Sequence, residues 1–203
     1  MAKVLAVTFF PRGEMSNTKK LYEEVKSNLG DVELVELDLT KDQPVLLDAV
    51  STMAYVKRNY MAQTLSAEDA ASLATADRHR EMLESADKVI LAYPMWNFSV
   101  PATVKAWIDE VVQAGKTFTM NESGFVGLLK GKKGLVIQTS GGAYDIAPMI
   151  DYDHATPLAK GVLEFMGIET SVVTAGGMNA GKEVESMSAA QAKIAEVLPL
   201  FLA

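Results

Sequence analysis

The sequence predicts a single α/β domain built on a parallel β-sheet that helices cover on both faces. Short runs rich in Val, Leu and Ile alternate with longer segments in which apolar residues recur every three or four positions. Strands that are apolar along their whole length are typical of parallel sheets buried on both faces. No repeat or linker-like stretch divides the 203 residues, so we expect one domain over residues 1–203.

Five apolar runs are predicted to form the strands, at residues 3–10, 32–39, 87–93, 134–139 and 169–175. Helices are expected at residues 17–29, 66–85, 101–115, 155–167 and 188–202. Ser66 is a favourable N-cap for the second of these helices. Pro101 and Gly115 suit the start and the end of the third.

Three segments interrupt the alternation of strands and helices. Residues 44–63 are ambiguous and suggest one or two short helices. Residues 117–129 contain the turn signal Asn121-Glu122-Ser123-Gly124 between two apolar stretches, which predicts a small hairpin or loop excursion. Residues 143–153 are expected to form a long loop.

These elements predict a flavodoxin-like three-layer sandwich with a five-stranded parallel sheet in the order 2-1-3-4-5. In such sheets, ligands bind at the carboxyl ends of the strands, where the strand order reverses. The rule brings together the loops after the first, third and fourth strands, at residues 10–18, 94–99 and 139–144. We therefore expect one ligand site built from these three loops.

Composition limits the partners of the chain. With 19 Lys and Arg against 26 Asp and Glu, the formal charge is −7, so we expect neither nucleic acid nor a membrane as a partner. The absence of cysteine excludes disulfides and thiolate chemistry and fits a cytoplasmic location. The two histidines lie far apart, so no metal site is expected. His79 is predicted to lie on an exposed helix face, and His154 to lie in a loop that borders the site.

The first loop ends in Ser16-Asn17-Thr18 at a predicted helix start. Hydroxyl groups and first-turn N–H groups at such a position can bind a phosphate, and the helix dipole favours the anion. Ordinary N-capping by Ser16 is the alternative interpretation. The chain has neither a G-x-G-x-x-G fingerprint nor a P-loop.

The second loop combines flat apolar groups with a carboxamide, in the order Pro94-Met95-Trp96-Asn97-Phe98. A planar heteroaromatic cofactor needs both kinds of contact, although simple core packing is the alternative. Prolines at 94 and 101 restrict the backbone of this loop and argue for a defined shape.

The third loop has paired glycines at a strand end, in the order Thr139-Ser140-Gly141-Gly142-Ala143-Tyr144. Glycine permits close backbone approach and positive φ angles, so successive N–H groups can face a ligand. An ordinary tight turn is the alternative interpretation.

With these three loops, the chain resembles the flavodoxin-like, FMN-dependent NADH azoreductases, which also act as quinone reductases. The resemblance extends over nearly the whole chain and is most specific at residues 94–98 and at Ala114-Gly115-Lys116-Thr117-Phe118. It implies a homodimer with FMN at two interface sites. NADH or NADPH would reduce the flavin, and a quinone or azo compound would then take the electrons in a ping-pong cycle.

The resemblance also implies roles for individual residues. Ser16, Asn17 and Thr18 would hold the FMN phosphate. The isoalloxazine ring would lie against Pro94, Met95, Trp96, Asn97 and Phe98, with Asn97 near flavin N5 as the candidate catalytic residue. The pyrimidine end would contact the third loop, at Thr139, Ser140, Gly141, Gly142 and Tyr144.

Three residues depart from the family pattern, namely Phe10, Met120 and Ser140, and they leave the preferred acceptor open. Two other classes of function stay open as well. A flavodoxin-like electron carrier would pass single electrons to a protein partner without using a nicotinamide. A scaffold or regulatory module would keep the fold without a cofactor.

Overall fold

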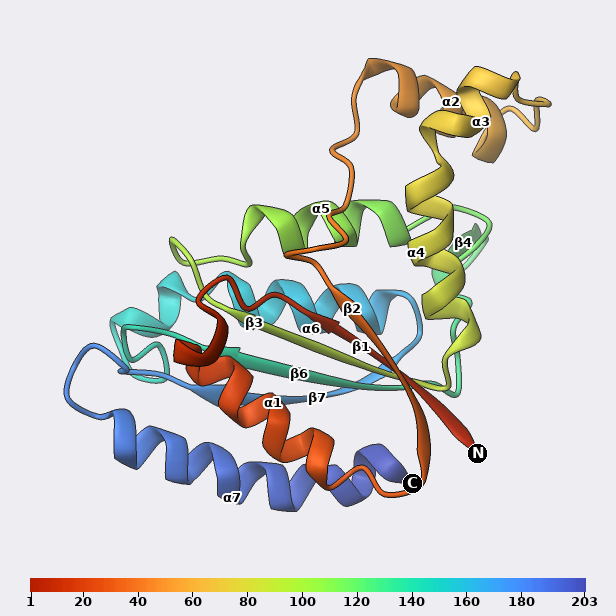
Figure 1. The fold of residues 1–203 in the computed structure, drawn as a ribbon. Coiled ribbons are helices and arrows are strands. Elements are labelled where there is room, and N and C mark those ends of the chain that lie inside the picture. Colours follow the sequence, from red (N-terminus) through yellow and green to blue (C-terminus); the bar gives the residue numbers. More distant parts are fainter.

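The computed structural model describes residues 1–203 and is built on a five-stranded parallel sheet (Figure 1). The strands run in the order β2-β1-β3-β6-β7. Their bounds are Val32–Asp38 for β2, Ala2–Thr8 for β1, Lys88–Pro94 for β3, Lys133–Thr139 for β6 and Glu169–Ala175 for β7. Numbered within the sheet alone, this is the predicted order 2-1-3-4-5, so the predicted fold class is confirmed.

Helices cover both faces of the sheet (Figure 1). On one face lie α1 (Asn17–Ser27) and α7 (Glu183–Leu202), and on the other lie α4 (Ala74–Ser85), α5 (Ala102–Val111) and α6 (Ala155–Phe165). Alternate residues of each strand face opposite layers. In β1, for example, Val4 and Ala6 join the core on the α1 side, whereas Leu5 and Val7 join the core on the α5 side.

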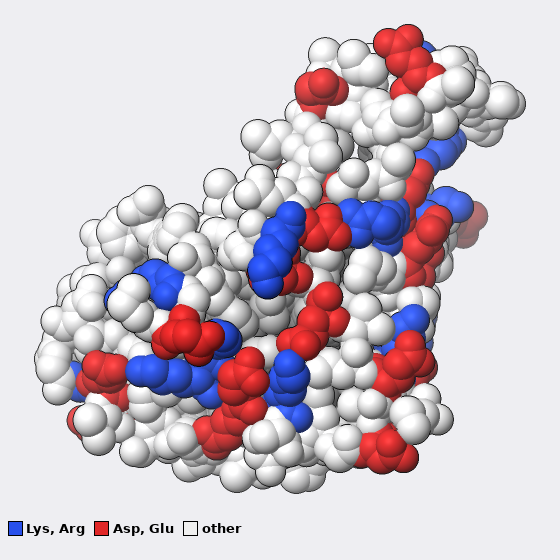
Figure 2. Space-filling view, in the orientation of Figure 1, with Lys and Arg blue, Asp and Glu red and all other residues white.

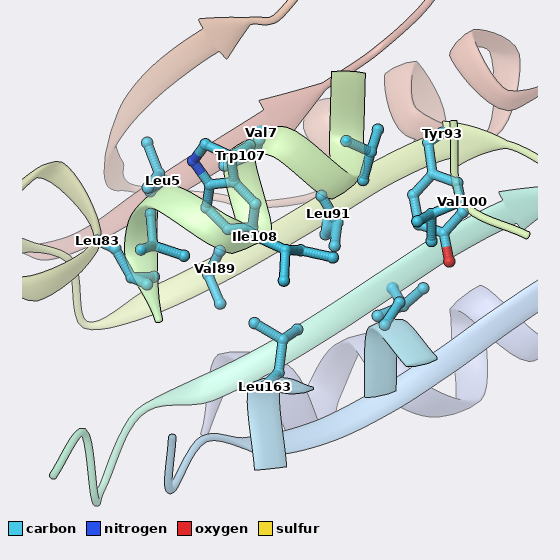
Figure 3. Packing of buried hydrophobic residues seen from close by; sticks show 14 of the residues in the cluster. Leu5, Val7, Leu83, Val89, Leu91, Tyr93, Val100, Trp107, Ile108 and Leu163 are labelled. Carbon is cyan, nitrogen blue, oxygen red and sulfur yellow. The ribbon is translucent and has the colours of Figure 1, made fainter. Parts of the chain in front are cut away.

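Trp107 is the largest side chain that is completely buried. Figure 3 shows its ring on α5, packed over Leu5 and Val7 of β1, with Leu83 of α4 close by. Burial of side chains this large accounts for much of the stability of an α/β domain.

The ambiguous residues 44–63 form the start of an arm that projects from the body of the molecule (Figure 1). The arm consists of α2 (Ala49–Asn59) and α3 (Ala67–Ser72). The predicted continuous helix over residues 66–85 is wrong, because the chain breaks between α3 and α4 at Leu73. Leu73 is 1% exposed and lies with Tyr55 and Val112 around a small cavity at the base of the arm, so tertiary packing sets the break.

The predicted hairpin is confirmed as β4 (Phe118–Asn121) paired with β5 (Gly124–Gly127). Phe118 packs on Phe165 of α6, with ring centroids 4.8 Å apart. Two 3₁₀ turns, η1 (Gly13–Met15) and η2 (Met149–Tyr152), lie in the loops after β1 and β6. None of the helices combines the length and the apolar character needed to cross a membrane.

The prediction that His79 lies on an exposed helix face is wrong. Its side chain is completely buried, because this face of α4 packs against α5. His79 Nδ1 lies 2.5 Å from Glu110 Oε2, and the other oxygen of Glu110 accepts a hydrogen bond from Val45 N at 2.7 Å. These contacts attach the segment that leads into the arm to the body of the molecule.

Candidate functional site

The loops after β1, β3 and β6 meet around a cavity of about 200 Å³ at the carboxyl edge of the sheet. Many of the predicted site residues line it, namely Ser16, Asn17, Pro94, Met95, Trp96, Thr139, Ser140 and Gly141. Arg12 is the only charged side chain in its wall. The sequence thus brings a helix N-terminus, one cation and a flat apolar surface to one place.

The N-terminus of α1 forms one end of the cavity. Ser16 is the N-cap, and its Oγ accepts a hydrogen bond from Lys19 N at 3.3 Å. The amides of Asn17 and Thr18 donate to no other backbone carbonyl, as expected in the first turn of a helix. These amides and the helix dipole make this end suitable for an anion.

Thr18 is placed differently from Ser16. Its side chain is completely buried, and its Oγ1 lies 2.7 Å from Thr139 Oγ1 at the end of β6. The hydroxyl pair joins the first and third loops beneath the cavity. Thr18 is therefore not part of the cavity wall, and its hydroxyl is already engaged.

The second loop is a two-residue turn between Trp96 and Ser99, closed by two backbone hydrogen bonds of 3.0 Å each. Both central residues have positive φ, +47° at Asn97 and +70° at Phe98. Asn tolerates this conformation, but for Phe it is strained. Such strain persists only where the surroundings impose it, and it is concentrated at functional sites.

Contacts on both sides hold this turn in place. Phe98 O accepts a hydrogen bond from His154 N at 2.8 Å. The Phe98 ring lies 5.5 Å from the ring of Tyr152 and 6.2 Å from that of Tyr144, measured between centroids. The structure therefore brings Phe98 and Tyr144 together, although neither lines the cavity itself. Asn97 is exposed at the tip of the turn.

The paired glycines of the third loop allow neighbouring side chains to approach closely, and neither Gly141 nor Gly142 adopts a positive φ. A Cβ at position 141 would lie 2.5 Å from Asn179 Nδ2, and one at position 142 would lie 3.0 Å from the Tyr144 ring. Neither glycine amide donates to a backbone carbonyl, so both are available to a ligand.

Sequence reasoning missed a fourth loop, which follows β7. Three amides there donate to the third loop, from Gly177 to Gly142 O at 2.8 Å, from Met178 to Ser140 O at 3.1 Å and from Asn179 to Gly141 O at 3.0 Å. Met178 and Asn179 also line the cavity. The sequence feature that could have revealed this loop is the pair Gly176-Gly177 after the fifth predicted strand, which repeats the pattern of Gly141-Gly142.

Tyr93 supports the site from below. Its hydroxyl donates to Ala155 O at 3.1 Å and so joins the end of β3 to the start of α6. Burial raises the pKa of the Tyr93 phenol, with a smaller contribution from the charge of Asp153. Tyr93 is therefore a neutral structural residue rather than an acid or base.

A larger cavity, of about 690 Å³, lies along β2 and outside this site. Most of its charged groups already have partners. Glu36, for example, pairs with Lys26 at 2.8 Å and accepts a hydrogen bond from Tyr22 Oη at 2.6 Å. Asp38 likewise pairs with Lys41 at 3.1 Å. Groups that satisfy one another leave no demand for a ligand, so we assign none there.

Comparisons with known proteins agree with this geometry. A family model described as a flavodoxin-like fold matches residues 2–198. An FMN-dependent NADH:quinone oxidoreductase from Agrobacterium fabrum is 34% identical, over 97% of this chain and 98% of the relative. A protein of the same name from Vibrio parahaemolyticus is 35% identical, over 96% of this chain and 98% of the relative.

Solved structures show the same similarity. The crystal structure of an azoreductase from Bacillus anthracis str. Sterne has a TM-score of 0.90 at 30% identity, covering 98% of this chain and 99% of that one. A second structure from this species, of an FMN-dependent NADH-azoreductase in complex with FMN, has a TM-score of 0.89. At 24% identity over 100% of both chains, that second similarity supports the fold alone.

Proposed function

This chain belongs to the flavodoxin-like family of FMN-dependent NADH:quinone oxidoreductases and azoreductases, and we propose that it reduces quinones and azo compounds with NADH through bound FMN. One observation carries the proposal. The N-terminus of an 11-residue helix, the apolar residues that lead into the strained Asn-Phe turn, and the free amide of Gly141 converge on one cavity at the switch point of the sheet.

The residues around the cavity fit FMN, of which a cavity of about 200 Å³ holds only a part. Ser16 and the amide of Asn17, supported by the buried Thr18, would hold the phosphate, with Arg12 supplying a positive charge. Pro94, Met95 and Trp96 offer an apolar wall, and the exposed Asn97 and Phe98 extend it beyond the cavity. Thr139, Ser140, Gly141 and Gly142, with Tyr144 against Gly142, would face the pyrimidine end.

When bound, FMN supplies the redox chemistry by accepting a hydride from the nicotinamide and passing the electrons to the second substrate. The free amides of Gly141 and Gly142 would stabilise the negative charge that reduction places on the pyrimidine end. Asn97, fixed by its turn, would orient the reacting face through its carboxamide. Because these residues bind and orient, no general acid or base needs to stand in the cavity.

We further propose that both substrates use the same open face in turn, as a ping-pong cycle requires. The exposed aromatic rings of Trp96 and Phe98 suit flat acceptors, which need little more than stacking. NADH is the donor named for the relatives, and NADPH remains a candidate. The cytoplasm, with its nicotinamide pool, is the compartment that this chemistry and the absence of cysteine favour.

A homodimer is part of the same proposal, supported by the arm. The arm and its root expose several large apolar side chains, namely Leu46, Leu47, Val50, Met53, Tyr60 and Met61. Figure 2 shows few charged groups on the arm, whereas Lys, Arg, Asp and Glu alternate across the body below it. An apolar surface of this kind on a projecting element is typical of a protein interface. A second copy of the chain would cover it.

The proposal is tested by purifying the protein with FMN and following flavin absorbance in anaerobic stopped flow. We expect NADH to bleach the flavin and a quinone to restore its colour. A flavin that stays oxidised with both NADH and NADPH would contradict the proposal and favour the electron carrier. Protein that retains no flavin would favour the cofactor-free scaffold.

A further inference from the structure

A second cavity, of about 230 Å³, lies on the other side of the third loop from the proposed FMN cavity. The ends of β6 and β7 and residues of α6 and α7 enclose it. Ser140 lines both cavities and forms part of the wall between them. Ser140 and Tyr144 in its wall belong to the loop assigned above to FMN, whereas Gln138, Asp145, Thr156 and Ser186 have no role in that assignment.

Gln138, the penultimate residue of β6, lines this cavity and is only 2% exposed. Its Oε1 accepts a hydrogen bond from Thr156 Oγ1 at 3.3 Å, while its Nε2 has no partner. Exchanging the amide oxygen and nitrogen would still leave one polar atom without a partner, because Thr156 Oγ1 would then pair with Nε2 and the amide oxygen would have no hydrogen bond. A buried polar atom without a partner needs an explanation, and a bound group in the cavity provides one.

The other lining groups restrict what that bound group can be. Asp145 and Asp153 bring two carboxylates to the wall, and no Lys or Arg lines it. Asp153 Oδ1 already accepts hydrogen bonds of 2.9 Å from the amides of Ala155 and Thr156, which leaves its Oδ2 and the carboxylate of Asp145 for a ligand. A phosphate or carboxylate would be repelled there. A cation would suit the carboxylates but offers no acceptor to Gln138 Nε2. A hydroxyl group meets both requirements, because it can donate a hydrogen bond to a carboxylate and accept one from the amide of Gln138.

Tyr144, Thr156 and Ser186 add further hydroxyls to the wall, so several hydroxyls of one ligand can be bound together. The cavity volume is below the range of pockets that enclose a whole drug-sized molecule, which begins at about 300 Å³. It therefore suits one sugar-sized part of a larger molecule. The rest of that molecule would lie over the third loop, toward the proposed FMN cavity.

We propose that this cavity binds the adenosine-side ribose of NADH, an inference that rests on the function proposed above. With the nicotinamide over the FMN cavity, the dinucleotide crosses the third loop and places this ribose against Asp145 and Asp153. Carboxylates recognise the free ribose 2′-hydroxyl in the same way in other dinucleotide sites. The two negative charges also disfavour the 2′-phosphate of NADPH, so the cavity selects NADH.

The test compares NADH with reduced nicotinamide mononucleotide, which carries the reacting ring but lacks adenosine. Asp145 is exposed, so Asp145→Asn is not expected to disturb folding. We expect this variant to lower kcat/KM for NADH about tenfold, mainly through KM, and to leave kcat/KM for the mononucleotide unchanged. Asp151→Asn is the matched control, because Asp151 is an exposed carboxylate of the same segment outside the cavity.

A binding measurement separates this inference from the proposed function. ADP-ribose is titrated by calorimetry into the FMN-loaded wild type, Asp145→Asn and Gln138→Met, the last of which removes the buried amide. Binding by the wild type that weakens in both variants supports the inference, even if NADH oxidation fails. The inference is overturned, even if NADH oxidation succeeds, when ADP-ribose does not bind or binds equally to all three proteins. It is also overturned when Asp145→Asn lowers kcat/KM equally for NADH and for the mononucleotide.

Discussion

The strained turn at Asn97 allows the catalytic and structural roles of this residue to be separated. Asn97 has a φ of +47°, where an L residue other than Gly, Asn or Asp is disfavoured by about 1–2 kcal/mol. Asn97→Ala should therefore destabilise the protein by about 1 kcal/mol, which lowers Tm by about 2–4 °C in a chain of this length. Asn97→Gly keeps the positive φ without strain and should leave stability within about 1 kcal/mol of the wild type.

Both variants remove the carboxamide, so both should slow hydride transfer alike. The loss of one hydrogen bond to a developing charge, about 1.5–3 kcal/mol, corresponds to roughly a 10- to 100-fold lower rate. The assays are thermal denaturation and single-turnover reduction of the flavin by NADH in stopped flow. If Asn97→Gly kept the wild-type rate while Asn97→Ala lost it, the side chain would serve only the conformation of the turn.

Three other predictions concern different parts of the molecule. Ser16→Ala should cost about 0.5–2 kcal/mol of stability and weaken FMN binding, whereas Ser66→Ala, which removes the N-cap of α3, should leave FMN affinity unchanged in fluorescence titrations. Thr18→Val should lower the free energy of unfolding by about 1–3 kcal/mol by leaving the Thr139 hydroxyl without its partner, and adding Thr139→Val should recover part of that loss in denaturant unfolding. Met53→Lys replaces a 50%-exposed apolar side chain of the arm with a charged one, so it should convert a dimer into monomers in sedimentation velocity. An unchanged sedimentation coefficient would show that the interface lies elsewhere.

The sequence determined the sheet and most of its helices. Apolar runs of strand length alternate with segments of helical periodicity, and a parallel sheet covered by helices buries the apolar residues of both. The switch-point rule then located the loops at residues 10–18, 94–99 and 139–144, and the structure places residues of all three around one cavity. These conclusions depend on local patterns, which a single sequence displays.

Tertiary packing decided the rest, because contacts between distant residues have no local signature. His79 is surrounded by charged neighbours in sequence, yet the packing of α4 on α5 buries it against Glu110. The positive φ of Phe98 goes against the conformational preference of this residue. It is held by the turn and by the hydrogen bond that Phe98 O accepts from His154 N. Met178 and Asn179 reach the cavity only because β7 lies beside β6 in the sheet. Periodicity shows which face of an element is buried, whereas only the assembled fold shows what that face contacts.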